Sequence, residues 1–89
     1  MRFEWHRAKA EENLRKHGIS FDEAVTVFYD PLSATFDDEE HFADEARFIT
    51  VGYSARGRLL VVAHTERGPN VRIISARRAT VPERKRHET

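Results

Sequence analysis

Two neighbouring segments of the sequence hold side chains that could transfer protons and bind phosphate. His64 and Glu66 are two residues apart, and Arg72 and Arg77 follow in the next segment. Cleavage of RNA without a metal requires a deprotonated 2′-oxygen, a protonated leaving 5′-oxygen and neutralisation of the charge on the phosphate. Histidine, with an ordinary pKa of about 6.5, suits either proton transfer, and arginine binds phosphate oxygens bidentately. These residue types can therefore divide the tasks of RNA cleavage.

The same residues also have a purely structural interpretation. Glu66 and Arg72 could form a cross-strand ion pair, and His64 could be an ordinary half-buried residue of a sheet. Ion pairs on sheets greatly outnumber active sites, so residue types alone favour this second interpretation.

Charge is unevenly distributed along the chain, although the formal net charge is zero. Residues 1–45 carry −7, from 12 Asp or Glu and 5 Lys or Arg, and residues 46–89 carry +7, from 3 Asp or Glu and 10 Lys or Arg. Nine of those ten basic residues are arginine, whose planar fork matches phosphate better than the point charge of lysine. The sequence therefore predicts a phosphate-rich partner such as nucleic acid.

Size and composition narrow the class of protein. A chain of 89 residues fits one small domain over 1–89. There is no cysteine, the N-terminal segment is charged, and no long apolar run occurs, so we expect a cytoplasmic protein with no membrane segment. No two histidines have helical metal-binding spacing, and no glycine-rich phosphate loop is present, so we expect neither a metal nor a cofactor.

The pattern of residues predicts an α+β domain with two N-terminal helices, a four-stranded antiparallel sheet and one C-terminal helix. Gly18 ends the first helix, and two capping boxes, Ser20 with Glu23 and Thr80 with Glu83, begin the others. Phe3 and Trp5 could stack on a base, but packing against the first helix is the favoured interpretation. The predicted helices cover residues 7–17, 20–30 and 80–87, and the predicted strands cover 32–36, 47–54, 58–67 and 71–77.

The turns between the last three strands set which residues share a face. Symmetric three-residue turns would pair Ser54 with Arg58 and Arg67 with Val71. One face would then be the core, with Arg47 and Arg77 at its margins, and the other would be an open binding surface. A bulge would exchange residues between the faces. The expected core face holds Ile49, Val51, Tyr53, Leu59, Val61, Ala63, Val71 and Ile73, and the expected open face holds Phe48, Thr50, Leu60, Val62, His64, Glu66, Arg72, Ile74 and Arg78.

Several blocks of the sequence resemble the BrnT toxins of bacterial type II toxin–antitoxin systems. The blocks occur in the family's order over nearly the whole chain. Two positions depart from the family pattern: His6 replaces an aspartate that would cap the first helix, and His87 replaces a tyrosine near the end. The blocks are Phe3-Glu4-Trp5, Lys9-Ala10, Asn13, Lys16-His17-Gly18, Phe21, Glu45, residues 47–52 and 57–62, His64-Thr65, residues 72–77, and Glu83-Arg84.

The resemblance implies a small ribonuclease with a RelE-like fold that cleaves cellular RNA and arrests growth. Its partner would be a BrnA-like antitoxin with a ribbon-helix-helix domain, and the protein would meet promoter DNA only through this antitoxin. The family pattern supports Arg72 and Arg77 and adds Arg47 and Glu45 as site residues.

The sequence thus leads us to expect a metal-independent endoribonuclease toxin. Arg72 and Arg77 would bind the scissile phosphate, with His64 and Glu66 as acid and base. Two alternatives remain, an RNA-binding module without catalysis and a protein-interaction module. The remaining site residues expected are Arg47, Arg58, Arg78 and Lys85 for flanking RNA, and Glu45, Glu83 and His87 as further candidates.

Overall fold

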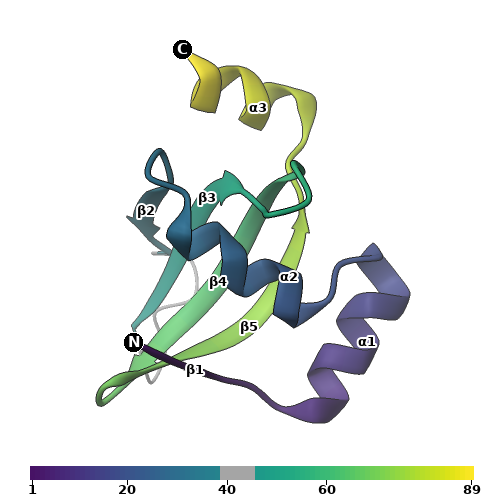
Figure 1. The fold of residues 1–89 in the computed structure, drawn as a ribbon, viewed down its shortest axis with the longest axis vertical. Helices are drawn as coiled ribbons and strands as arrows, with labels where there is room; N and C mark the ends of the chain where they lie inside the picture. Colours follow the sequence, from purple (N-terminus) through teal and green to yellow (C-terminus); the bar gives the residue numbers. More distant parts are fainter. Residues whose placement is uncertain (39–45) are drawn as a thin grey trace.

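The computed structural model describes residues 1–38 and 46–89, which form one mixed sheet with helices around it (Figure 1). The sheet has five strands in the order β1-β5-β4-β3-β2. The α+β class is confirmed, but the expected four-stranded antiparallel sheet is wrong, because β1 pairs in parallel with β5. The elements are β1 (Arg2–Glu4), α1 (Arg7–His17), α2 (Phe21–Thr26), the 3-10 helix η1 (Val27–Tyr29), β2 (Ala34–Asp37), β3 (Arg47–Tyr53), β4 (Leu59–Arg67), β5 (Asn70–Arg78) and α3 (Val81–Glu88).

The helix ends follow the predicted capping signals. Gly18 adopts a left-handed conformation with φ 69°, and its N–H donates to the carbonyl of Leu14 at 2.9 Å. The hydroxyl of Ser20 accepts from the backbone N–H of Glu23 at 3.0 Å. Thr80 and Glu83 form both bonds of a capping box, whereas His6 makes no side-chain capping bond. Within the described residues, no helix is long and apolar enough to cross a membrane.

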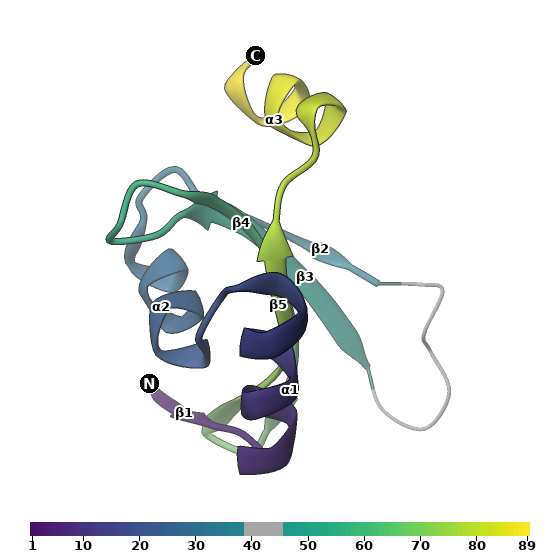
Figure 2. The same ribbon diagram turned by 90° about the vertical axis from the view of Figure 1, so that its right-hand side faces the viewer.

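Helices α1 and α2 cover one face of the sheet, which we call the inner face, and leave the opposite, outer face without them (Figure 2). The inner face was expected to be open, so that expectation is wrong. Phe3 and Trp5 pack here against the rings of Phe28 and Phe21, with centroids 5.1 and 5.8 Å apart, which confirms core packing. The buried core comprises Ile19, Phe21, Ala24, Val27, Leu60, Val62, Val71, Ile73 and Ala76.

A bulge in β5 decides which of its side chains point outward. The strand begins with Arg67 opposite Asn70, so the turn has two residues rather than the expected three. Between Ala63 and His64 the register shifts, and Ile74 has no partner on β4. Because side chains alternate along a strand, Val71 and Ile73 before the bulge and Ala76 after it all face inward. Arg72 and Arg77 consequently both face outward.

Asn13 fastens α1 to β5 just beyond this bulge. Its side chain is buried, and its Nδ2 donates to the carbonyls of Ile19 at 2.9 Å and Ala76 at 2.8 Å. Its Oδ1 accepts from the N–H of Ala76 at 3.0 Å. The amide thus satisfies both backbone groups of Ala76, as a neighbouring strand would.

Candidate nucleic-acid interface

Three arginines of the basic half share the outer face. Arg47 lies opposite Thr65, and Thr65 lies opposite Arg72, so these residues form one row across β3, β4 and β5. Arg77 lies opposite Val61. Since Val61 and Thr65 are four residues apart on β4, the backbones of Arg77 and Arg72 are about 13 Å apart along the sheet. The bulge is what places Arg72 on the face of the other two.

Glu4 of the edge strand β1 holds the guanidinium of Arg72. Nε and Nη2 of Arg72 donate to Oε2 of Glu4 at 3.1 and 2.9 Å, and Nδ2 of Asn70 donates to Oε1 at 2.9 Å. The hydrogen bonds from Asn70 and then Arg72 lower the pKa of the Glu4 carboxyl. Glu4 is therefore an anion that fixes one edge of the guanidinium and leaves the edge formed by Nη1 and Nη2 facing away.

Glu83 of α3 holds Arg77 in the complementary way. Nη1 and Nη2 of Arg77 donate to Oε1 and Oε2 of Glu83 at 2.7 and 2.9 Å, so the edge formed by Nε and Nη2 is the one left over. Hydrogen bonding, first from Arg77 and then from the backbone of Thr80, lowers the pKa of Glu83 to about 2. The Arg77 side chain remains 42% exposed. Arg77 thus shares a face with Val61, as the predicted register has it. That face was expected to be the core, but it is the outer face, which α1 and α2 do not cover.

His64 and Glu66 do not join this group, which corrects the expected cluster. His64 is 5% exposed on the inner face, and its Nε2 lies 2.7 Å from Oγ1 of Thr50. Burial lowers its pKa to about 4, so the ring is neutral at pH 7 and is separated from the outer face by the sheet. Glu66 pairs with Val71 rather than with Arg72, because the turn is one residue shorter than expected. Neither side chain is positioned to move a proton beside the arginine row.

Arg58 also has a different role from the one expected. Its Nε donates to Oε2 of Glu23 at 2.9 Å, and its Nη2 bonds to Oε1 of the same carboxylate. The Ser54 hydroxyl donates to Oε2 of Glu23 at 2.7 Å. The bond from Arg58 is the main cause of a lowered Glu23 pKa, and the side chain of Glu23 is only 5% exposed. The Arg58 guanidinium therefore joins the β3–β4 turn to α2 through Glu23.

The remaining expected residues lie at the edges of the molecule or outside the described part. Arg78 is exposed at the end of β5, opposite Leu60 and so on the inner side of the sheet. Lys85 is exposed on α3, and Glu45 lies outside the described residues.

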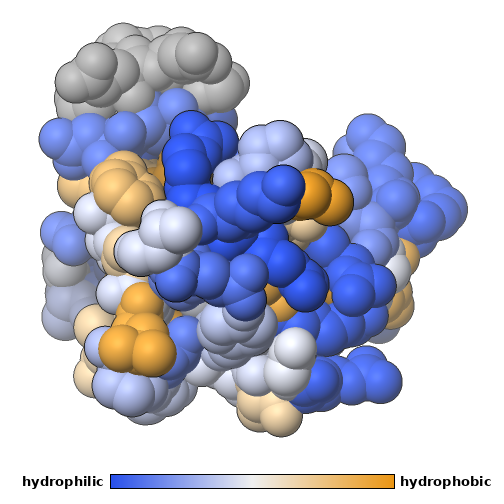
Figure 3. Space-filling view, turned by 90° about the horizontal axis from the view of Figure 1, so that it is seen from above, coloured by the Kyte–Doolittle hydropathy of each residue, from blue (hydrophilic) through white to orange (hydrophobic). Residues whose placement is uncertain are grey.

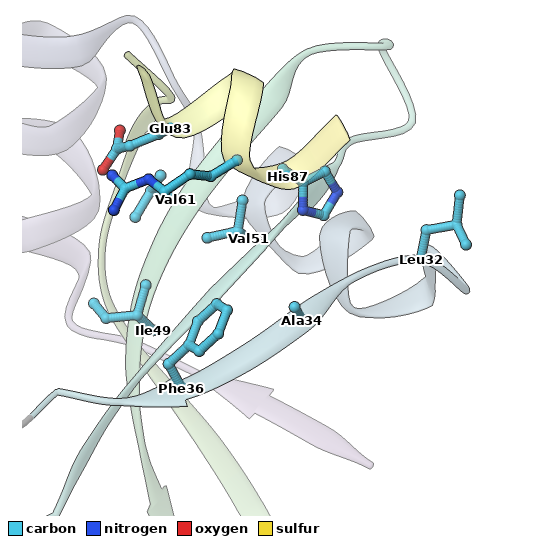
Figure 4. Close-up of a pocket in the computed structure, with 9 residues that line it drawn as sticks. Leu32, Ala34, Phe36, Ile49, Val51, Val61, Glu83 and His87 are labelled. Atoms are coloured by element: carbon cyan, nitrogen blue, oxygen red, sulfur yellow. The ribbon is translucent and has the colours of Figure 1, made fainter. Parts of the chain in front are cut away.

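A hollow of about 550 Å³ separates α3 from the outer face (Figure 4). Seen from its α3 end, the molecule is mostly hydrophilic with separate hydrophobic patches (Figure 3). Tyr53 of β3 holds α3 against the sheet. Its hydroxyl donates to Glu88 at 3.1 Å, and the centroids of its ring and that of His87 are 6.0 Å apart. Sequence reasoning missed the hollow, since it treated Ile49, Val51 and Val61 as core. Its lining is Leu32, Ala34, Phe36, Ile49, Val51, Val61, Glu83, Arg86 and His87.

Metal ligands do not gather in the described part of the chain. Among residues 1–38 and 46–89, no three His, Asp or Glu side chains are grouped so that they could hold an ion. The chemistry that the outer face offers is the binding and neutralisation of anions by arginine.

Comparison with known proteins agrees with this architecture. A family model described as "Ribonuclease toxin, BrnT, of type II toxin-antitoxin system" matches residues 5–83. The crystal structure of the Brucella abortus ribonuclease toxin BrnT is similar, with a TM-score of 0.70 and 20% sequence identity over 90% of this chain and 97% of that chain. No curated protein matches. The expected RelE-like arrangement of four antiparallel strands differs from the observed sheet by strand β1. Because the family model spans nearly the whole chain, the protein belongs to the BrnT family of ribonuclease toxins of type II toxin–antitoxin systems.

Proposed function

We propose that this protein is a metal-independent endoribonuclease that cleaves cellular RNA in the cytoplasm and arrests growth until a BrnA-like antitoxin neutralises it. The observation that carries the proposal is the bulge at Ile74, because it brings Arg72 onto the outer face with Arg47 and Arg77. Three arginines on one face, two of them paired with carboxylates, offer guanidinium N–H groups that suit the phosphates of a nucleic-acid backbone.

The three arginines would bind different parts of the RNA. Arg72 and Arg77 are held at opposite ends of the face by separate carboxylates, and each leaves one guanidinium edge for phosphate oxygens. Arg77 would neutralise the scissile phosphate, and Arg72 with Arg47 would hold the adjoining backbone. This assignment revises the expectation that Arg72 and Arg77 bind the same phosphate.

His87 is the proposed proton-transfer residue. It lies four residues after Glu83 on α3, and both side chains line the hollow (Figure 4). Glu83 in turn bonds to Arg77, which places the hollow close to that arginine. Glu83, with a pKa of about 2 and both oxygens bonded to Arg77, is a poor proton acceptor. His87 would take the proton from the 2′-hydroxyl or give one to the leaving 5′-oxygen, in place of the tyrosine usual at this position.

Expression from a tightly controlled promoter, followed by analysis of growth and total RNA, tests the proposal. Arg72→Ala, Arg77→Ala and His87→Ala should each relieve growth arrest and reduce cleavage by purified protein in EDTA, on the order of 100-fold. Arg15→Ala, a change at an exposed arginine of α1, is the matched control and should remain toxic. Circular dichroism would verify that each variant folds.

The alternatives predict different results. RNA retention without cleavage products would indicate a binding module, and neither retention nor cleavage would indicate a protein-interaction module. Full toxicity of both Arg72→Ala and Arg77→Ala would refute the proposed site. Coexpression with the BrnA-like antitoxin should restore growth.

A further inference from the structure

We propose that the hollow beneath α3 binds one unpaired nucleobase of the RNA, with the base stacked on the ring of Phe36. This inference rests on the proposed function, because it requires RNA on the outer face. It adds a base-binding site to the arginine contacts, which bind phosphate and do not distinguish bases.

The lining of the hollow matches the two kinds of surface that a base presents. Its floor is aliphatic, from Ile49, Val51 and Val61 on β3 and β4, and its opposite wall carries charged and polar groups of α3 (Figure 4). A nucleobase has apolar faces and a polar edge, so it can contact both. The volume of about 550 Å³ lies within the range of small-molecule sites.

Phe36 supplies an exposed aromatic surface that contacts no other ring among residues 1–38 and 46–89. It lies on the edge strand β2, opposite Ile49, and is 57% exposed. In contrast, Phe3, Phe28 and Phe48 contact other rings on the inner face. An exposed aromatic ring at the rim of an apolar hollow beside cationic side chains is the arrangement with which proteins stack single-stranded bases.

The position of the hollow links it to the phosphate contacts. Glu83 lies in its wall and also holds Arg77, so a phosphate at Arg77 and a base in the hollow would belong to the same or adjacent nucleotides. Arg86 and His87 complete this wall. An apolar protein segment in the same place would bury these polar groups without partners, at a cost that the edge of a base avoids.

Binding of an uncleavable RNA tests the site separately from catalysis. Fluorescence anisotropy would compare a 2′-O-methyl hexanucleotide with versions in which one base at a time is removed, on wild-type protein and on Phe36→Ala. One abasic position should weaken wild-type binding about tenfold. The Phe36→Ala variant should bind the intact oligonucleotide about tenfold more weakly than wild type does. Removal of that same base should then cause no further loss of its affinity.

Further variants separate stacking from stability. Phe36→Leu should behave as Phe36→Ala does, and Phe36→Trp should restore binding. Leu14→Ala, a change at an exposed apolar residue of α1, should bind as wild type does. Unfolding curves would confirm that the Phe36 variants fold.

Each other outcome decides between the two proposals. Additive effects of the abasic position and Phe36→Ala would overturn the base site, as would unchanged RNA binding by Phe36→Ala together with lost antitoxin binding. Non-additive effects in a protein that fails to cleave RNA would support the base site and refute the ribonuclease proposal. RNA cleavage together with additive effects would support the ribonuclease proposal and refute the base site.

Discussion

Replacement of Asn13 by alanine should destabilise the fold far more than its place on a polar helix suggests. The change removes three hydrogen bonds and leaves the carbonyls of Ile19 and Ala76 and the N–H of Ala76 without their side-chain partner. Each such bond contributes about 1 kcal/mol. Alanine's better helix propensity recovers about 0.5 kcal/mol. We therefore expect a net loss of about 2.5 kcal/mol.

Urea unfolding followed by the fluorescence of Trp5 measures this loss directly. Trp5 is the sole tryptophan and packs edge-on against Phe21 in the core, so its signal reports global unfolding. For a domain of this size the melting temperature should fall by roughly 10 to 20 °C. Leu14→Ala, at the exposed neighbouring position, is the matched control and should change stability by less than about 0.5 kcal/mol.

Asn13→Asp distinguishes the role of the amide nitrogen of Asn13 from that of its oxygen. The aspartate keeps an acceptor for the N–H of Ala76 but places an oxygen against the carbonyls of Ile19 and Ala76. It should therefore be at least as unstable as the alanine variant. The reasoning would be refuted if Asn13→Ala lost no more stability than Leu14→Ala.

Two further predictions concern residues that the sequence assigned to the site. Lowering the pH from 7 to 5 should cost wild type about 2 kcal/mol more than His64→Gln, measured by urea unfolding. The unfolded His64, with a pKa of about 6.5, takes up a proton in this range, whereas the folded side chain, with a pKa of about 4, does not, so stability falls as the pH falls. Arg58→Ala should lower stability by about 2 kcal/mol, because the buried Glu23 carboxylate loses both hydrogen bonds from Arg58 and keeps only Ser54 and the more distant Arg56, and should leave RNA affinity unchanged. Arg72→Ala should weaken RNA binding instead, and equal RNA affinities of the two variants would contradict these assignments.

Local signals predicted most of the elements but not their tertiary relations. Gly18, Ser20 and Thr80 mark helix ends through bonds within a few residues, so the sequence alone identifies them. Strand β1 spans three residues, too few for a periodic pattern, and its partner is almost seventy residues away. The side chain of Glu23 had the spacing of a capping box, yet it bonds to Arg58, which no local pattern indicates.

Which side chains form the candidate site depends on a one-residue shift in the pairing of β4 with β5. Ile74 is a β-branched residue within a run that suits a regular strand, so nothing in the sequence marks it as a bulge. Without that bulge and the shorter turn, alternation places Arg72 and Arg77 on opposite faces, with Glu66 opposite Arg72 and His64 opposite Ile74. The types of the proposed phosphate-binding residues were therefore readable from the sequence, whereas their grouping on one face was not.

Two contacts join residues that are far apart in the sequence, and this separation determines how early the arginine row can form during protein synthesis. Glu4 bonds to Arg72, 68 residues later, and Asn13 bonds to Ala76, 63 residues later. At a translation rate of roughly 5 to 20 residues per second, the N-terminal strand and helix wait several seconds for these partners. A nascent chain that still lacks β5 has neither Arg72 nor Arg77, nor the strand to which Asn13 attaches. The protein therefore completes its arginine row only after β5 has been synthesised.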